Sequence, residues 1–196
     1  EAQFKLLSER PILKSLHLKT ILDSIQQEVA VYDHAFANLQ LLVKEKGFKN
    51  YGEIGKMRMA AHDLEGRKGV DQVLLLNLRR HEKDFLLRNE EGYVDKFEDK
   101  YERLYASIAQ SSRVRTGEKR LLLDSLASYH ACFAKEVALE KQTGIKDNTG
   151  LKHDLGVQAD RLAKHFNILL KKAEEEKKRW FYQLHVSLIC LGLLFL

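Results

Sequence analysis

Apolar side chains recur at alternating steps of four and three residues along most of this chain. In the first predicted helix, which ends at Lys46, the series has no break and comprises Leu18, Leu22, Ile25, Val29, Tyr32, Phe36, Leu39 and Val43. This spacing places the apolar residues on one stripe of a helix, as in coiled coils and long helical bundles. Pro11 is the one proline, so glycines and polar turns provide the later interruptions. The pattern predicts an all-α protein.

Glycine-containing turns divide the remaining sequence into further helical arms. We expect the chain to reverse at residues 47–51 (GFKNY), 89–92 (NEEG) and 144–150 (GIKDNTG), and the two middle arms to be interrupted at residues 66–69 (GRKG) and 111–117 (SSRVRTG). Short connections make successive arms antiparallel neighbours. The prediction is therefore an elongated up-down-up-down helical bundle, divided by the two interruptions into two stacked four-helix modules.

A weak internal repeat accompanies this arrangement. Four residues of the second arm match four of the last helix at a constant offset: Gly52, Met57, Ala61 and Leu64 correspond to Gly150, Leu155, Ala159 and Leu162. The repeat predicts two helices that start in the same way, although chance similarity between amphipathic helices accounts for it equally well.

The last seventeen residues, 180–196 (WFYQLHVSLICLGLLFL), contain no charged side chain. A transmembrane helix needs about 20 apolar residues. We interpret residues 181–196 as the start of a truncated transmembrane helix that follows a folded domain of residues 1–180. Trp180 and Tyr182 suit the membrane interface. The alternative interpretation is a C-terminal amphipathic or core helix.

A basic collar precedes this apolar end. It consists of Lys171, Lys172, Lys177, Lys178 and Arg179, interspersed with Glu174, Glu175 and Glu176. Positive residues beside a span favour the cytoplasmic side, although whole domains are translocated largely regardless of their charge. The orientation of the chain is therefore left open by its charges.

Composition and motifs argue against several classes of function. The net charge of +5 is spread among acidic residues, with no basic stripe that would indicate nucleic-acid binding. No Glu-x-x-His pair, Gly-x-Ser-x-Gly motif or phosphate loop occurs. Cys132 and Cys190 are too dissimilar in setting to form a disulfide framework. We expect no enzyme activity, metal or cofactor in this region, and no nucleic-acid partner.

Residues 76–97 read LNLRRHEKDFLLRNEEGYVDKF, and this stretch resembles the helical bimodular sensor domain of bacterial chemoreceptors and sensor histidine kinases. The match is carried by Arg79, Arg80, Glu82, Lys83, Asp84, Phe85, Leu86, Arg88, Tyr93, Val94 and Phe97. Residues 52–65 (GEIGKMRMAAHDLE) resemble the second helix of the same family. Residues 144–155 resemble the opening of its last helix, but His153 and Gly156 depart from the family pattern.

The resemblance implies an extracytoplasmic, periplasmic domain of an inner-membrane receptor that binds a small molecule such as an organic acid and acts as a homodimer. In such a receptor the last helix passes the signal to a cytoplasmic effector, either a histidine kinase of a two-component system or a methyl-accepting chemotaxis module. A different class remains open, namely a tail-anchored cytoplasmic coiled-coil tether or scaffold.

Candidate ligand-binding residues fall into two groups. We name Arg79, Tyr101 and Tyr105 for the module nearer the membrane. For the farther module we name Arg58, His62, Tyr129 and Arg161. An arginine matches a ligand carboxylate in bidentate geometry, so Arg79 is either a ligand contact or part of a salt-bridged signature that sets helix register. For Glu82 and Asp84 the structural role is favoured, because both have intrahelical ion-pair spacings to arginine.

Overall fold

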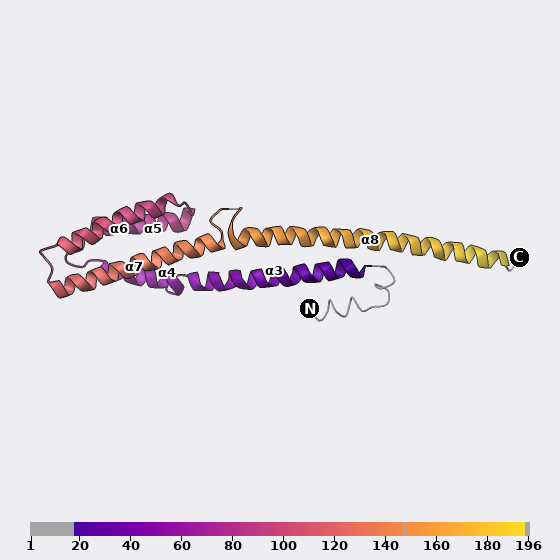
Figure 1. Ribbon diagram of the computed structural model, residues 1–196, viewed down its shortest axis with the longest axis horizontal. Helices are drawn as coiled ribbons and strands as arrows, with labels where there is room; N and C mark the ends of the chain where they lie inside the picture. The colour runs from indigo at the N-terminus through magenta and orange to yellow at the C-terminus, as the bar shows by residue number, and fades with distance from the viewer. Residues whose placement is uncertain (1–17, 147, 195–196) are drawn as a thin grey trace. The chain divides into compact units, whose positions relative to one another are not determined.

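The computed structural model describes residues 18–146 and 148–194, and it confirms the all-α prediction (Figure 1). Six helices occur in this part of the chain: α3 (Lys19–Lys46), α4 (Gly52–Leu64), α5 (Gln72–Arg88), α6 (Gly92–Gln110), α7 (Thr116–Thr143) and α8 (Gly150–Leu194). Pro11 and the start of the predicted domain 1–180 lie outside the described residues, as do the last two positions of the predicted segment 181–196.

The described residues divide into two compact units. One unit is Ala37–His153, which holds the end of α3, the whole of α4 to α7 and the start of α8. The other consists of residues 18–36 and 154–194, from α3 and α8.

Helices α4 to α7 form an up-down-up-down four-helix bundle within the first unit. The helix pairs that pack along one another are α4 with α7, α5 with α6, and α6 with α7. At one end Lys141 of α7 contacts Glu91 beside α6 (3.0 Å), and at the other Lys119 of α7 contacts the carbonyl of Ala109 (2.8 Å). These contacts make α6 and α7 antiparallel. Figure 1 shows α5 and α6 side by side as a hairpin.

The expected interruptions of the middle arms are confirmed as helix breaks, but each break reverses the chain. Gln72 of α5 returns to the carbonyl of Leu64 (3.3 Å), and the ion pair of Arg79 with Glu65 holds α5 along α4. The connection can fold so tightly because Gly66 and Gly69 adopt positive φ angles of 66° and 91°, which cost glycine little. Hydrophobic periodicity specifies a stripe on a helix but not the direction of the chain after a break.

The four helices share a single core, which differs from the two stacked modules expected from the sequence. Fully buried side chains come from every helix of the bundle: Met57, Leu64, Leu75, Leu78, Phe85, Phe97, Leu104, Ile108, Leu126, Tyr129 and Phe133. Phe85 and Phe97, expected in the nearer module, both contact Phe133 of the farther one. Phe85 meets it edge to face and Phe97 stacks on it, with ring centroids 5.6 and 3.8 Å apart. The reversals bring these residues together.

Two glycine-closed loops flank the bundle. Gly47 and Gly52 have positive φ angles, and a Cβ on either glycine would collide with the backbone of the other. Residues 48–51 therefore form a loop whose two ends are in contact. Gly144 and Gly150 approach each other in the same way. Gly52 and Gly150 have φ angles of 68° and 70° at the starts of α4 and α8. The internal repeat therefore marks two equivalent helix starts.

The predicted reversal between the first helix and α4 is wrong. After the loop closed by Gly47 and Gly52, the end of α3 contacts α7 rather than packing along α4. Lys46 forms ion pairs with Glu136 (3.3 Å) and with Glu140. A loop whose two ends touch does not have to turn the chain back, and the sequence of the turn alone does not distinguish the two outcomes.

The second unit pairs the first part of α3 with α8. His165 Nδ1 lies 3.0 Å from Glu28 Oε2, and Leu22 and Ile25 are buried. Farther along the predicted stripe Phe36 remains 44% exposed, and Phe166 of α8 41% exposed. Among the described residues, no helix combines the length and the apolar character needed to cross a membrane.

Candidate functional site

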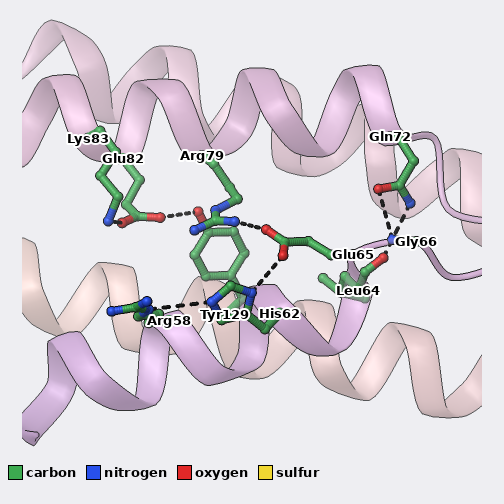
Figure 2. Close-up of polar contacts among 10 residues, drawn as sticks. All are labelled: Arg58, His62, Leu64, Glu65, Gly66, Gln72, Arg79, Glu82, Lys83 and Tyr129. Carbon is green, nitrogen blue, oxygen red and sulfur yellow. Dashed lines mark hydrogen bonds and ion pairs between the residues drawn. The ribbon is translucent and has the colours of Figure 1, made fainter. Parts of the chain in front are cut away.

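The four-helix bundle contains two neighbouring groups of polar contacts, one between α5 and α7 and one between α4 and α5, which we together call the polar network (Figure 2). In the first group the Tyr129 hydroxyl donates a hydrogen bond to Glu82 Oε2 (2.5 Å), and Lys83 Nζ donates to Glu82 Oε1 (2.5 Å). Both Tyr129 and Glu82 are buried. Since each carboxylate oxygen has a partner, the buried charge of Glu82 is compensated. Burial and the nearby Glu82 charge raise the pKa of Tyr129, which keeps its hydroxyl protonated as a donor.

The second group, between α4 and α5, is more accessible to solvent. Arg79 forms an ion pair with Glu65, and its side chain is 21% exposed. The other oxygen of the Glu65 carboxylate accepts a hydrogen bond from His62 Nδ1 (2.6 Å), and Arg58 Nε donates to His62 Nε2 (3.4 Å). With the ring proton on Nδ1, both contacts of His62 are hydrogen bonds of normal polarity. Figure 2 shows these contacts passing around the Tyr129 ring, from Arg58 and His62 on α4 to Arg79 on α5.

The turn between α4 and α5 fixes the position of Glu65 in this chain. Gln72 accepts from the Gly66 amide (3.1 Å) and donates to the carbonyls of Leu64 (3.3 Å) and Val70 (3.4 Å). Asp71 caps α5 by accepting from the amides of the second and third residues beyond it, at 2.9 and 3.1 Å. Gln72 and Asp71, at the α5 end of the turn, therefore hold the turn in place. The turn in this conformation keeps Glu65 facing Arg79.

The structure brings together four of the seven predicted site residues. Arg58, His62, Arg79 and Tyr129 belong to one network, although the sequence analysis assigned Arg79 to a different module from the other three. They meet because α5 folds back along α4. Arg161 is exposed on the part of α8 that belongs to the other compact unit, and its convergence with Arg58, His62 and Tyr129 stays a prediction.

Tyr101 and Tyr105 belong to a separate aromatic cluster on α6 and α7. The Tyr101 ring stacks on His130 with centroids 4.2 Å apart, and Tyr105 lies 6.3 Å from Tyr101. His130 Nε2 contacts both carboxylate oxygens of Glu98, at 2.8 and 3.0 Å. Burial is the main cause of the raised pKa of Tyr101, with smaller contributions from Tyr105 and Glu98. The expected grouping of these two tyrosines with Arg79 is not found.

The sequence pattern does not predict a role for Glu65 or for the buried carboxylates near the end of α3. Glu136 and Glu140 lie in the core against Lys46, and Glu53 is held by Lys56 (2.8 Å) and Lys135 (3.1 Å). The hydrogen bond from Lys56 lowers the pKa of Glu53, whereas burial raises that of Glu136 against the opposing effect of Lys46. One signal in the sequence indicates a buried carboxylate: Glu140 continues the apolar spacing of Phe133 and Val137.

The side chains of the network interact chiefly through charge. Within residues 18–146 and 148–194, no three His, Cys, Asp or Glu side chains are grouped so that they could hold a metal ion. Arg79 is the cation that is both partly exposed and paired with a partly exposed carboxylate, Glu65. The contact with Glu65 uses one terminal nitrogen of the guanidinium and one carboxylate oxygen, so Arg79 has further N–H donors for a second carboxylate.

Comparisons with protein-family models, with curated proteins and with solved structures gave no match to this chain. The resemblance to the helical bimodular sensor domain therefore rests on the residues quoted above and remains a prediction.

Proposed function

We propose that this chain is the small-molecule-sensing domain of a bacterial membrane receptor, located in the periplasm and acting as a homodimer. The observation that carries this proposal is the partly exposed ion pair between Arg79 and Glu65, which lies beside the fully buried pair of Tyr129 and Glu82 (Figure 2). The buried contact between Tyr129 and Glu82 holds α5 against α7, and Arg79 of α5 lies beside it. This arrangement suits recognition of an organic acid, because the guanidinium is already positioned when the ligand arrives.

Ligand exchange at this position has a mechanical consequence. Glu65 is the C-cap of α4 and Arg79 lies in α5, so their ion pair closes the α4–α5 hairpin. A ligand that replaces Glu65 releases that contact and favours a different spacing of the two helices. It shifts the equilibrium only by the difference between its affinities for the two arrangements.

The output element in this proposal is α8, which is continuous from Gly150 to Leu194. Its residues from Trp180 to Leu194 carry no charge, and we propose that they associate with the membrane. A continuous helix transmits a small slide or rotation along its length. The cytoplasmic effector, a histidine kinase or chemotaxis module, supplies all chemistry.

The exposed apolar residues of the second unit support the homodimer. Phe36 and Phe166 continue the seams of α3 and α8 but remain 44% and 41% exposed in the single chain. A second copy would cover them, as in coiled coils that bury such a seam against a partner. The tether alternative is favoured by one feature, the basic collar before the apolar end, which is typical of the cytoplasmic side of a membrane.

A thermal-shift screen with organic acids and amines tests the proposed function. At least one compound should stabilise the chain, and Arg79→Ala should weaken its binding about tenfold or more through loss of a charge-assisted contact. Arg80→Ala is the matched control, because Arg80 is the next residue, is 71% exposed and makes only a 3.8 Å contact with Asp84. If Arg79→Ala lowers stability and leaves affinity intact, Arg79 is a structural residue.

A further inference from the structure

A polar groove of about 700 Å³ lies where the α4–α5 turn meets the α6–α7 turn. Two cationic side chains, Lys68 and Arg113, line it from opposite turns. Three hydroxyl groups and one amide complete most of the lining: Ser107, Ser111, Ser112 and Gln110. The groove is at the end of the bundle where both reversals occur, and the Arg79 network does not contribute to its lining.

The walls of the groove are held rigidly against each other. Val70 and Val114 are each 8% exposed, one from each turn. Gly69 has a φ of 91°, and a Cβ there would collide with Val114 Cγ2, so the two turns are in direct contact. Lys119 ties the end of α6 to α7 through the carbonyl of Ala109 (2.8 Å). Groups fixed in this way lose little freedom when a ligand binds.

The charges of the groove are available to a ligand. Lys68 and Arg113 are exposed, and neither side chain forms an ion pair with any residue of the described chain. The acidic side chain in the lining, Asp71, is committed to the amides of Val73 (2.9 Å) and Leu74 (3.1 Å) at the start of α5. Both bonds use Asp71 Oδ1, so the groove offers two cations and several hydroxyl groups beside one carboxylate that is held at the start of α5.

Guanidinium and ammonium groups, combined with hydroxyl donors, match the oxygen atoms of phosphate and carboxylate groups. The valines in the lining turns are buried, so an apolar ligand body would find little surface to cover. We propose that this groove is a binding site for a small, highly oxygenated anion, held between Lys68 and Arg113. This site goes beyond the proposed sensing function and does not depend on it.

Isothermal titration of the full 196-residue chain, in micelles of an uncharged detergent, tests the proposal with two probes, inorganic phosphate and succinate. Ionic strength is kept constant with sodium chloride. We expect saturable one-to-one binding of at least one probe, and a loss of affinity of about tenfold or more in the Lys68→Ala/Arg113→Ala variant. The probe that binds more tightly identifies the ligand as a phosphate or a carboxylate compound.

Two control variants make the result decisive. Arg120→Ala removes an 86% exposed cation of α7 that does not line the groove, and it should leave affinity unchanged. Arg79→Ala is titrated as well, and a loss of affinity there combined with wild-type affinity in the double variant would place the probe at the Arg79 network and overturn the proposal. Equal weakening by Arg120→Ala would indicate general charge attraction. That outcome, a null titration with both probes, or wild-type affinity in the double variant would each overturn the proposal.

Loss of folding does not confuse this test. Lys68 and Arg113 are both exposed, so the double variant should retain the helical circular dichroism spectrum of the wild type. If its melting temperature falls, Arg113→Gln keeps a polar side chain at the same position and should still weaken binding severalfold. Wild-type affinity in a folded Arg113→Gln protein would again contradict the site.

Discussion

The Tyr129 hydroxyl and the Glu82 carboxylate meet at 2.5 Å across 47 positions of the sequence. Glu82 belongs to α5 and Tyr129 to α7, two helices that are separated in the sequence by α6. The contact is buried and satisfies one oxygen of a carboxylate whose other oxygen is bound by Lys83. It is therefore a position where a small chemical change should have a large effect on stability.

Replacing Tyr129 by phenylalanine should destabilise the bundle by about 1–3 kcal/mol, because Glu82 Oε2 then lacks its buried donor. Urea denaturation followed by circular dichroism measures the change. Tyr105→Phe is the matched control, because the same hydroxyl is removed from a side chain that is 44% exposed. Equal effects of the two substitutions would show that the hydrogen bond to Glu82 contributes little.

Glu65→Gln should increase the affinity of the chain for its carboxylate ligand. The substitution removes the charge that competes for Arg79 while retaining most of the side-chain shape. We expect tighter binding by roughly threefold to tenfold, the range typical of one charge-assisted contact, together with lower stability of the ligand-free protein. Titration with a compound from the thermal-shift screen measures it. Weaker binding in this variant would mean that Glu65 positions Arg79 for the ligand instead of competing with it.

Glu136 should make the bundle less stable as the pH rises. Burial raises the pKa of Glu136 above its ordinary value of 4.5, so the folded state holds the proton more tightly than the unfolded state. The associated stability is fully present below 4.5 and is lost as the pH increases through the folded-state pKa. Glu136→Gln cannot ionise and should lose less stability than the wild type between pH 4.5 and neutral pH.

Denaturation curves at several pH values measure this difference. Glu118→Gln, in the exposed first turn of α7, provides the matched control and should follow the wild type. A Glu136→Gln profile parallel to that of the wild type would show that Lys46 compensates fully for the burial of Glu136.

An insertion in α8 distinguishes a transmitting helix from a passive tether. Four residues inserted near Lys171 should rotate the apolar end by about 40° relative to the preceding helix, at 3.6 residues per turn. Ligand affinity should stay the same, while the output of the complete receptor should change. A seven-residue insertion, which nearly restores the original phase, serves as the control. Unchanged signalling after the four-residue insertion would favour the tether.

Much of the fold is predictable from the periodicity of apolar residues. The stripe containing Leu122, Leu126, Tyr129 and Phe133 forms one wall of the core, as the spacing indicates. The breaks after Leu64 and Gln110 were also placed correctly. The direction of the chain after each break was not predictable, because it depends on local φ angles at Gly66 and Gly69 and on the side-chain bonds of Gln72.

The candidate site was predictable only in part for the same reason. His62 with Arg58 has a helical spacing of four residues, which the sequence displays directly. The pairing of Arg79 with Glu65 requires the reversal between α4 and α5, so it is invisible until the turn is known. The buried pair of Glu82 and Tyr129 likewise depends on which helices become neighbours.

The loops closed by Gly47 with Gly52 and by Gly144 with Gly150 offer a practical use in protein engineering. Because the two ends of each loop are already in contact, extra residues placed between them need not displace the flanking helices, and long surface insertions cost little in loop entropy. Residues 48–51 are thus a suitable place for a fluorescent protein or an epitope, as are positions 145, 146, 148 and 149. A pair of labels there would report on the bundle in living cells without altering its core.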